Sequence, residues 1–179
     1  MRVRYFIALI VFAICLTFVK GADCDEGQPS EPELKAVFLY NFAKFIQWPT
    51  DSLRTNDSAF IIGIIGDNPF GDALKNSVEG KQVRKQKVHV LNISSEDSLA
   101  DCEMLFVCAS EKNRYENILK NIAGKPILTV GETTDFIDAG GIIGFYMKDN
   151  MVRFIINVEA AAQADLNISS KLLKLAKIK

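Results

Sequence analysis

Residues 35–49 read KAVFLYNFAKFIQWP, and this stretch decides how the N-terminal side of the chain folds. It follows Ser30-Glu31-Pro32-Glu33, a capping box in which the Ser hydroxyl accepts from a backbone N–H and Glu33 reaches back. Pro49 disfavours helical geometry at Trp48 and is predicted to end the helix there. Apolar residues recur at helical spacing, which predicts one broad buried face: Leu34, Val37, Phe38, Phe42, Phe45 and Ile46.

The predicted helix carries more apolar surface than one buried face needs. Beside the stripe of Phe38, Phe42 and Phe45 runs a second stripe, with further aromatic residues beyond it. This excess predicts either full burial under a sheet or an exposed apolar patch that a partner or a second copy covers. The residues of such a partner or dimer face would be Leu39, Tyr40, Ile46 and Trp48, with Ala43 between them.

Strand patterns and helix patterns alternate downstream of this helix. Strands are predicted at Ala59–Ile65, Lys87–Leu91, Met104–Ala109 and Pro126–Val130, and a hairpin at Ile142–Met147 with Val152–Val158. Helices or helical turns are predicted at 70–78, 94–99, 113–123, 135–139, 159–165 and 170–177. Continuous apolar strands are typical of parallel pairing. The sequence therefore predicts a single α/β layered domain with a mostly parallel sheet, an antiparallel hairpin at one edge and flanking helices.

The N-terminus has the pattern of a secretory leader. A positive start, MRVR, precedes 15 apolar residues at Tyr5–Val19, which is short of the about 20 that a membrane-spanning helix needs. We predict a cleavable signal peptide at 1–21, a flexible arm at 22–30 and the folded domain at 31–179. Lys20 makes the cleavage site imperfect, so retention as an anchor is the alternative.

The charge balance limits the kinds of partner. Loss of Arg2, Arg4 and Lys20 with the leader takes the basic residues from 21 to 18 against 22 acidic ones, a net charge near −4. No basic run with interleaved aromatic residues is evident in the sequence. We therefore predict no nucleic-acid partner. Cleavage of the leader in turn predicts no direct membrane insertion of the mature chain.

Cys24, Cys102 and Cys108 remain after loss of the leader, and export permits disulfides. If the run CEMLFVC is a strand, the Cα atoms of Cys102 and Cys108 lie roughly 20 Å apart, beyond the about 7 Å that a disulfide tolerates. They should not pair with each other. Cys24 could reach one of them or a second chain; alternatively, all three stay reduced. All three are redox candidates.

No set of residues in the sequence supports catalysis or metal binding. His89 is the only histidine and lies between Val88 and Val90 on a predicted strand, so a zinc site or a Ser-His-Asp triad lacks partners. Gly63, Gly66 and Gly71 match neither a dinucleotide nor a phosphate-binding loop. We predict no catalytic residues, no metal and no cofactor.

A small-ligand site is the second possibility, because ligands of such sheets bind outside the carboxyl ends of the strands. The residues of this candidate site are Gly66, Asp67, Asn68, Ala109, Ser110 and Gly131. If these residues bind a small molecule, the protein would be a sensor or carrier of that ligand.

Two blocks of the sequence resemble the YfiR family of small exported bacterial proteins. The first is KAVFLYNFAKFIQWP; the second runs from Gly140 through GGIIGF, VRFIIN and AAA to LNISSKLLKLA, ending at Ala176. Between them GIIGDNPFG and PILTVGE also match, so the resemblance spans about residues 33–177 in order.

This resemblance implies a periplasmic regulator without enzymatic activity. Relatives hold an inner-membrane diguanylate cyclase inactive by binding its periplasmic domain, and their release raises cyclic di-GMP and promotes biofilm formation. The partner could equally be a sensor kinase. A founding relative forms homodimers and carries two disulfides, which three mature cysteines cannot form in one chain.

Overall fold

The computed structural model describes residues 29–49, 59–94 and 96–179, and only the backbone of residues 96–98. The predicted leader, most of the predicted arm and Cys24 lie outside these residues. The described elements are, in chain order, α2 (Glu31–Phe45), β1 (Ile46–Gln47), β2 (Phe60–Ile65), α3 (Ala73–Val78), β3 (Gln82–Val83), β4 (Gln86–Ile93), the 3₁₀ helix η2 (Glu96–Asp101), β5 (Met104–Val107), the 3₁₀ helix η3 (Ala109–Arg114), α4 (Tyr115–Asn121), β6 (Leu128–Gly131), α5 (Asp135–Asp138), β7 (Ile143–Lys148), β8 (Met151–Ile156), α6 (Val158–Gln163), β9 (Asn167–Ile168), α7 (Ser170–Leu173) and β10 (Lys177–Ile178).

One eight-stranded sheet organises the fold, in the order β10-β8-β7-β6-β5-β2-β4-β3. The strands from β4 to β7 are parallel, β7 and β8 form an antiparallel hairpin, and β3 and β4 form another. The predicted fold class, α/β with a mostly parallel sheet and an antiparallel hairpin, is confirmed. The β7–β8 hairpin is not outermost, however, because β10 adds beside β8.

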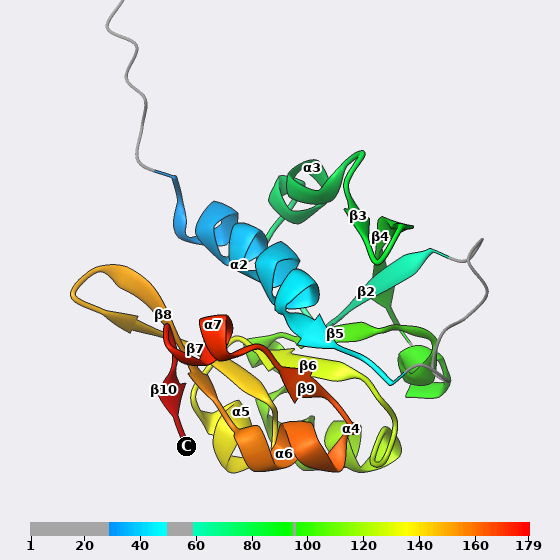
Figure 1. Ribbon diagram of the computed structural model, residues 1–179, viewed down its shortest axis with the longest axis vertical. Helices are drawn as coiled ribbons and strands as arrows, with labels where there is room; N and C mark the ends of the chain where they lie inside the picture. The colour runs from blue at the N-terminus through cyan, green and yellow to red at the C-terminus, as the bar shows by residue number, and fades with distance from the viewer. Residues whose placement is uncertain (1–28, 50–58, 95) are drawn as a thin grey trace, which may run out of the picture.

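Helices cover both faces of this sheet (Figure 1). Alternate residues of β5 show the two sides: Met104 and Phe106 join the core under α2 and α3, whereas Leu105 and Val107 join the core over α4 and α5. Both cores are apolar, which explains why the central strands read as continuous hydrophobic runs.

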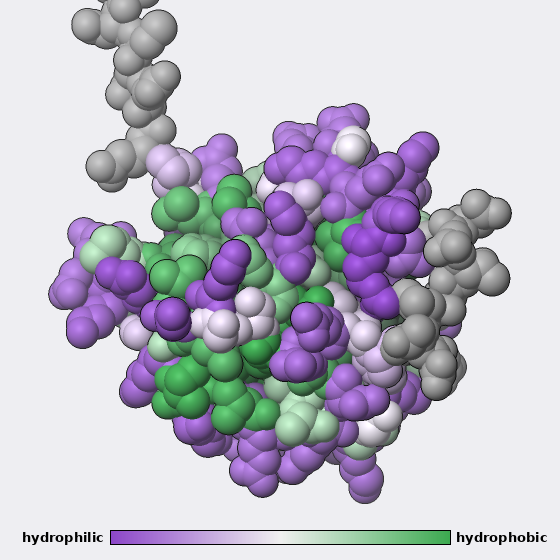
Figure 2. Space-filling model, in the orientation of Figure 1, coloured by the Kyte–Doolittle hydropathy of each residue, from purple (hydrophilic) through white to green (hydrophobic). Residues whose placement is uncertain are grey.

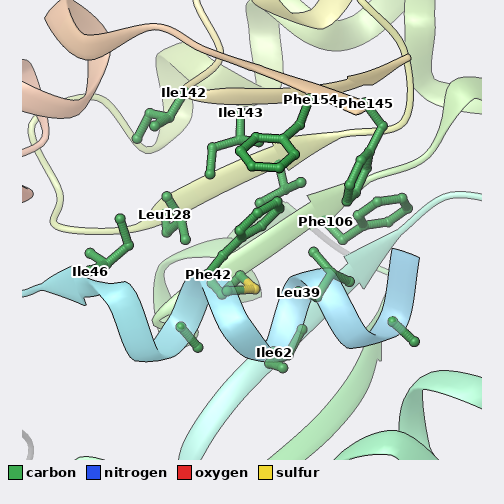
Figure 3. Close-up of a cluster of buried hydrophobic side chains, with 14 of the residues drawn as sticks. Leu39, Phe42, Ile46, Ile62, Phe106, Leu128, Ile142, Ile143, Phe145 and Phe154 are labelled. Carbon is green, nitrogen blue, oxygen red and sulfur yellow. The ribbon is translucent and has the colours of Figure 1, made fainter. Parts of the chain in front are cut away.

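Helix α2 lies across the sheet with Phe42 at the centre of its contacts (Figure 3). The Phe42 ring centroid lies 5.9 Å from that of Phe38, 5.7 Å from Phe145 and 4.9 Å from Phe154. The predicted buried face is right for Phe42 and wrong for Val37, which is 49% exposed. The predicted capping box at Ser30 and Glu33 is present.

The end of α2 differs from the prediction. The helix stops at Phe45 rather than at Trp48, and Ile46 and Gln47 pair with Ile168 and Asn167 as the separate two-stranded sheet β1–β9. Ser169 N–H also donates to the Phe45 carbonyl oxygen. Tertiary hydrogen bonds therefore end this helix before Pro49 can.

The last predicted helix is also shorter than expected. It ends at Leu173 instead of Lys177, and the chain then returns as β10 along β8. The Lys179 N–H donates to the Ile156 carbonyl oxygen. Strand β8 has an edge on this side with which no other described strand pairs, and β10 forms hydrogen bonds with it. A helix that continued to Lys177 could not form these bonds, so α7 ends early.

Candidate functional site

The carboxyl ends of β2, β5 and β6 meet at one edge of the sheet. Ile65 lies opposite Val107, and Val107 lies opposite Gly131. This register brings together the residues predicted from the sequence, and we call the set the strand-end site: Gly66, Asp67, Asn68, Ala109, Ser110 and Gly131. Gly131 is buried, whereas Gly66, Asp67, Ala109 and Ser110 are exposed.

Polar groups at the strand-end site bond to one another and to residues of the neighbouring turns and strands. The Asp67 N–H donates to Ser110 Oγ over 2.9 Å, and the Ala109 N–H donates to Glu132 Oε2 over 2.9 Å. Asn68 accepts from the Phe70 N–H over 2.9 Å and donates to Asn92 Oδ1 over 3.3 Å. These bonds join the turns at the ends of β2 and β5 to each other and to β4.

Gly66 is required at this edge for two reasons. Its φ is +96°, in the region that favours glycine. A Cβ at this position would lie 2.5 Å from Ser110 Oγ and 2.9 Å from Cys108 Cβ. The glycine at position 66 is therefore explained by a tight turn between β2 and the following residues. It does not require a phosphate-binding loop.

The electrostatics of the edge disfavour an anionic ligand and a reactive thiol. Burial of the thiol, together with the nearby carboxylates of Glu132, Asp67 and Glu111, raises the pKa of Cys108 to about 12. The thiol therefore stays protonated at neutral pH, and a thiolate nucleophile would not form.

Both described cysteines are buried, and no disulfide joins Cys102 to Cys108, as predicted. The Cys102 thiol donates to the Leu99 carbonyl oxygen over 3.2 Å. The predicted role of Cys24 lies outside the described residues.

A buried lysine that the sequence analysis missed ties α2 to this edge. Lys35 is 6% exposed, and its Nζ lies 2.6 Å from Glu31 Oε1 and 3.5 Å from Glu132 Oε1. A cavity of about 260 Å³ opens beside it, lined in part by Thr133, Phe145 and Tyr146. The signal that could have indicated it is the position of Lys35 between apolar Leu34 and Ala36.

The predicted partner face of α2 is largely core. Leu39 has no exposed surface, Ile46 is 5% exposed and Trp48 is 7% exposed, so these three side chains adopt the burial alternative. Tyr40 is half-buried, and its hydroxyl donates to the Gln82 carbonyl oxygen over 3.4 Å. Of the four, Tyr40 alone presents a sizeable surface.

The described residues offer little for metal chemistry. His89 is exposed on β4, and in the described part of the chain no group of three or more His, Cys, Asp or Glu side chains is placed to hold a metal ion. No helix between residues 29 and 179, in the part described, is long and apolar enough to cross a membrane.

The fold and edge just described define an α/β domain whose strand ends carry tight, self-bonded turns. Residues 32–177 match the model of the DUF4154 family, described as YfiR/HmsC-like. The chain belongs to this family, because the match covers most of its length and includes both sequence blocks.

Solved structures share the fold at low sequence identity. A crystal structure of a conserved domain protein from Vibrio cholerae aligns with a TM-score of 0.55 and 11% identity, over 85% of this chain and 61% of that one. The ABC domain of Streptococcus pneumoniae in complex with L-Trp aligns with a TM-score of 0.54 and 10% identity, over 83% and 60%. The chain thus spans less than two thirds of either structure. No curated protein matches the chain.

Proposed function

We propose that this protein is a non-enzymatic periplasmic regulator that binds and represses an inner-membrane signalling protein, a diguanylate cyclase in the first instance. The observation that carries the proposal is the family match over residues 32–177. The apolar h-region at Tyr5–Val19 supports export. The high pKa of Cys108, about 12, supports a role without nucleophilic catalysis.

Affinity capture from membranes tests this proposal. The tagged mature protein, beginning at Ala22, is incubated with solubilised inner membranes, and bound proteins are identified by mass spectrometry. We expect a membrane protein with a periplasmic domain and a cytoplasmic signalling domain. Deleting the gene should raise cyclic di-GMP, and restoring it should lower the level again. Recovery of no signalling protein, with unchanged cyclic di-GMP, would contradict the proposal.

A small-ligand sensor acting on a sensor kinase or another membrane protein is the second candidate. The convergence of Gly66–Asn68, Ala109 and Ser110 at one edge favours it. The acidic surroundings of Cys108 favour neutral or cationic ligands over nucleotides. Thermal-shift screening of amino acids, with nucleotides as the contrasting class, tests this. A ligand at 100 times its Kd adds about 2.7 kcal/mol, and a flat response to every compound would exclude this candidate.

A further inference from the structure

The β3–β4 hairpin concentrates positive charge in an otherwise acidic chain. Residues 81–87 read KQVRKQK, and no acidic residue occurs between Gly80 and Ser94. Arg84 and Lys85 form the two-residue turn, with φ of 54° and 69°. The hairpin therefore places four cations within seven residues, of which Lys81, Lys85 and Lys87 are exposed.

The fold adds further cations and two aromatic rings to this corner. Lys44 Nζ and Lys81 Nζ lie 5.4 Å and 4.7 Å from the centroid of Tyr40, and Arg84 Cζ lies 5.8 Å from that of Trp48. The sequence showed no basic patch with interleaved aromatic residues, because Tyr40 and Trp48 lie far from the hairpin in the chain. We call the assembled set the basic corner: Lys44, Lys75, Lys81, Arg84, Lys85 and Lys87.

The charges of the basic corner are not compensated by described residues. None of its six side chains forms an ion pair with a carboxylate in the described part of the chain. Figure 2 shows a mainly hydrophilic surface over α3 and β3. Since like charges held together cost free energy unless a counter-charge binds, this corner favours an acidic partner.

Strand β4 presents an open edge beside the basic corner. Strand β3 pairs with β4 only at Gln86 and Lys87. The Val88 N–H donates to the Lys81 carbonyl oxygen on that side, so the backbone of Val90 and Asn92 points the same way by alternation. Among the described residues no strand pairs with this edge beyond the hairpin.

A groove follows the same edge. It has a volume of about 360 Å³ and lies between α3 and β4, with Val78, Val88 and Val90 in its walls. Lys75, Lys81 and Lys87 also line it, with Glu79 as the acidic member. The groove thus combines a strand edge with which no further described strand pairs, apolar side chains and an excess of positive charge.

We propose that this groove binds an extended acidic segment of a partner protein, which adds to β4 as a further strand. The segment's backbone would bond to Val90 and Asn92, alternate apolar side chains would enter the groove, and its carboxylates would meet Lys81 and Lys87. An anionic membrane would use the cations but not the strand edge. As a docking surface for the proposed function, this groove can be tested with a peptide and without the membrane partner.

The test uses the full chain and a labelled probe peptide of three Glu-Val repeats, followed by fluorescence anisotropy at low and at physiological salt. We expect binding that weakens as salt rises. The double variant Lys81→Glu/Lys87→Glu should lower affinity at least tenfold. The matched control, Lys120→Glu/Lys125→Glu, makes the same charge change on exposed lysines beyond the groove and should bind as the parent does.

Two further measurements separate strand addition from simple charge attraction. Val90→Pro removes an N–H that points away from β2 and should abolish binding while the circular dichroism spectrum stays unchanged. A probe with alternate N-methylated residues should also fail to bind the parent protein. This measurement does not depend on whether Val90→Pro folds. Equal binding of the methylated probe would overturn strand addition. Equal loss in both double variants, or binding to phosphatidylglycerol vesicles but not to the peptide, would overturn the proposed partner.

Discussion

Phe42 connects the first helix to the far end of the chain through a cluster of rings. It has no exposed surface and contacts Phe38, Phe145 and Phe154. Phe42→Ala should lower the free energy of unfolding by about 3–5 kcal/mol, because it removes a buried ring and leaves a cavity. Urea denaturation measures this. Val37→Ala, on the exposed side of the same helix, is the control and should change stability by less than about 0.5 kcal/mol.

Leu39 tests the partner-face alternative at the level of a single side chain. Because Leu39 is fully buried, Leu39→Asp places a carboxylate in an apolar core and should unfold the domain. Circular dichroism reports the loss. Val37→Asp, on the exposed face of the same helix, should keep the spectrum and melting temperature of the parent. A folded Leu39→Asp protein that no longer binds its partner would instead support the partner face.

Cys108 should make stability depend on alkaline pH. The pKa of the folded-state thiol is raised to about 12 from its ordinary value of 9.0, so the unfolded chain loses this proton first. The stabilisation is fully present below about pH 9 and is lost as pH rises toward 12, by about 1.4 kcal/mol per pH unit.

The measurement is the difference in unfolding free energy between the parent and Cys108→Ala, from pH 8 to 11. Titrations of tyrosine and lysine residues are common to both proteins and largely cancel. We expect the parent's advantage to stay level up to about pH 9 and then to shrink toward pH 11. A difference that stays constant would mean that the folded thiol titrates normally.

At the scale of elements, the turn after β2 fixes the strand-end site. Gly66→Ala should destabilise by about 1–2 kcal/mol for its positive φ and by roughly another 1–3 kcal/mol for the contacts with Ser110 and Cys108. Gly71 is a matched control, with φ +51° and no atom within 4 Å of an added Cβ. Gly71→Ala should show only the first loss. Equal losses in thermal or urea unfolding would mean that the turn can relax.

Elements with a strong local pattern were predictable from the sequence. The apolar run at β2 and the ring spacing of α2 specify their structures almost alone. The short strands β1, β3, β9 and β10 were missed because two residues carry no readable period. Distant partners, not local propensity, create them.

The candidate site was predictable to a similar extent. Strand ends of a parallel sheet meet at one edge, so the convergence of Gly66, Ser110 and Gly131 followed from the element order. The Lys35–Glu132 contact did not, because a lysine in an amphipathic helix is ordinarily solvated. Tyr40 and Trp48 at the basic corner were likewise read as apolar surface, since their cationic neighbours come from another part of the chain.

At the scale of the whole molecule, the two apolar cores share one sheet and should melt together. A fragment covering residues 29–179 should therefore unfold in one cooperative transition, with calorimetric and van't Hoff enthalpies in agreement. The same experiment shows whether the domain needs any residue before position 29. The full chain is the reference. Two separate transitions, or a fragment that fails to fold, would show that the domain needs residues outside this range.

The pairing of β1 with β9 joins parts of the chain that are made far apart in time. Gln47 and Asn167 contact each other across 120 positions, and Phe42 rests on Phe145 and Phe154. The helix synthesised first therefore finds its neighbours only when nearly the whole chain has left the ribosome. Until then the nascent polypeptide displays a row of aromatic rings that chaperones can hold. If the chain is exported as proposed, this late closure keeps it unfolded, and so able to pass a translocation channel, until its final segment emerges.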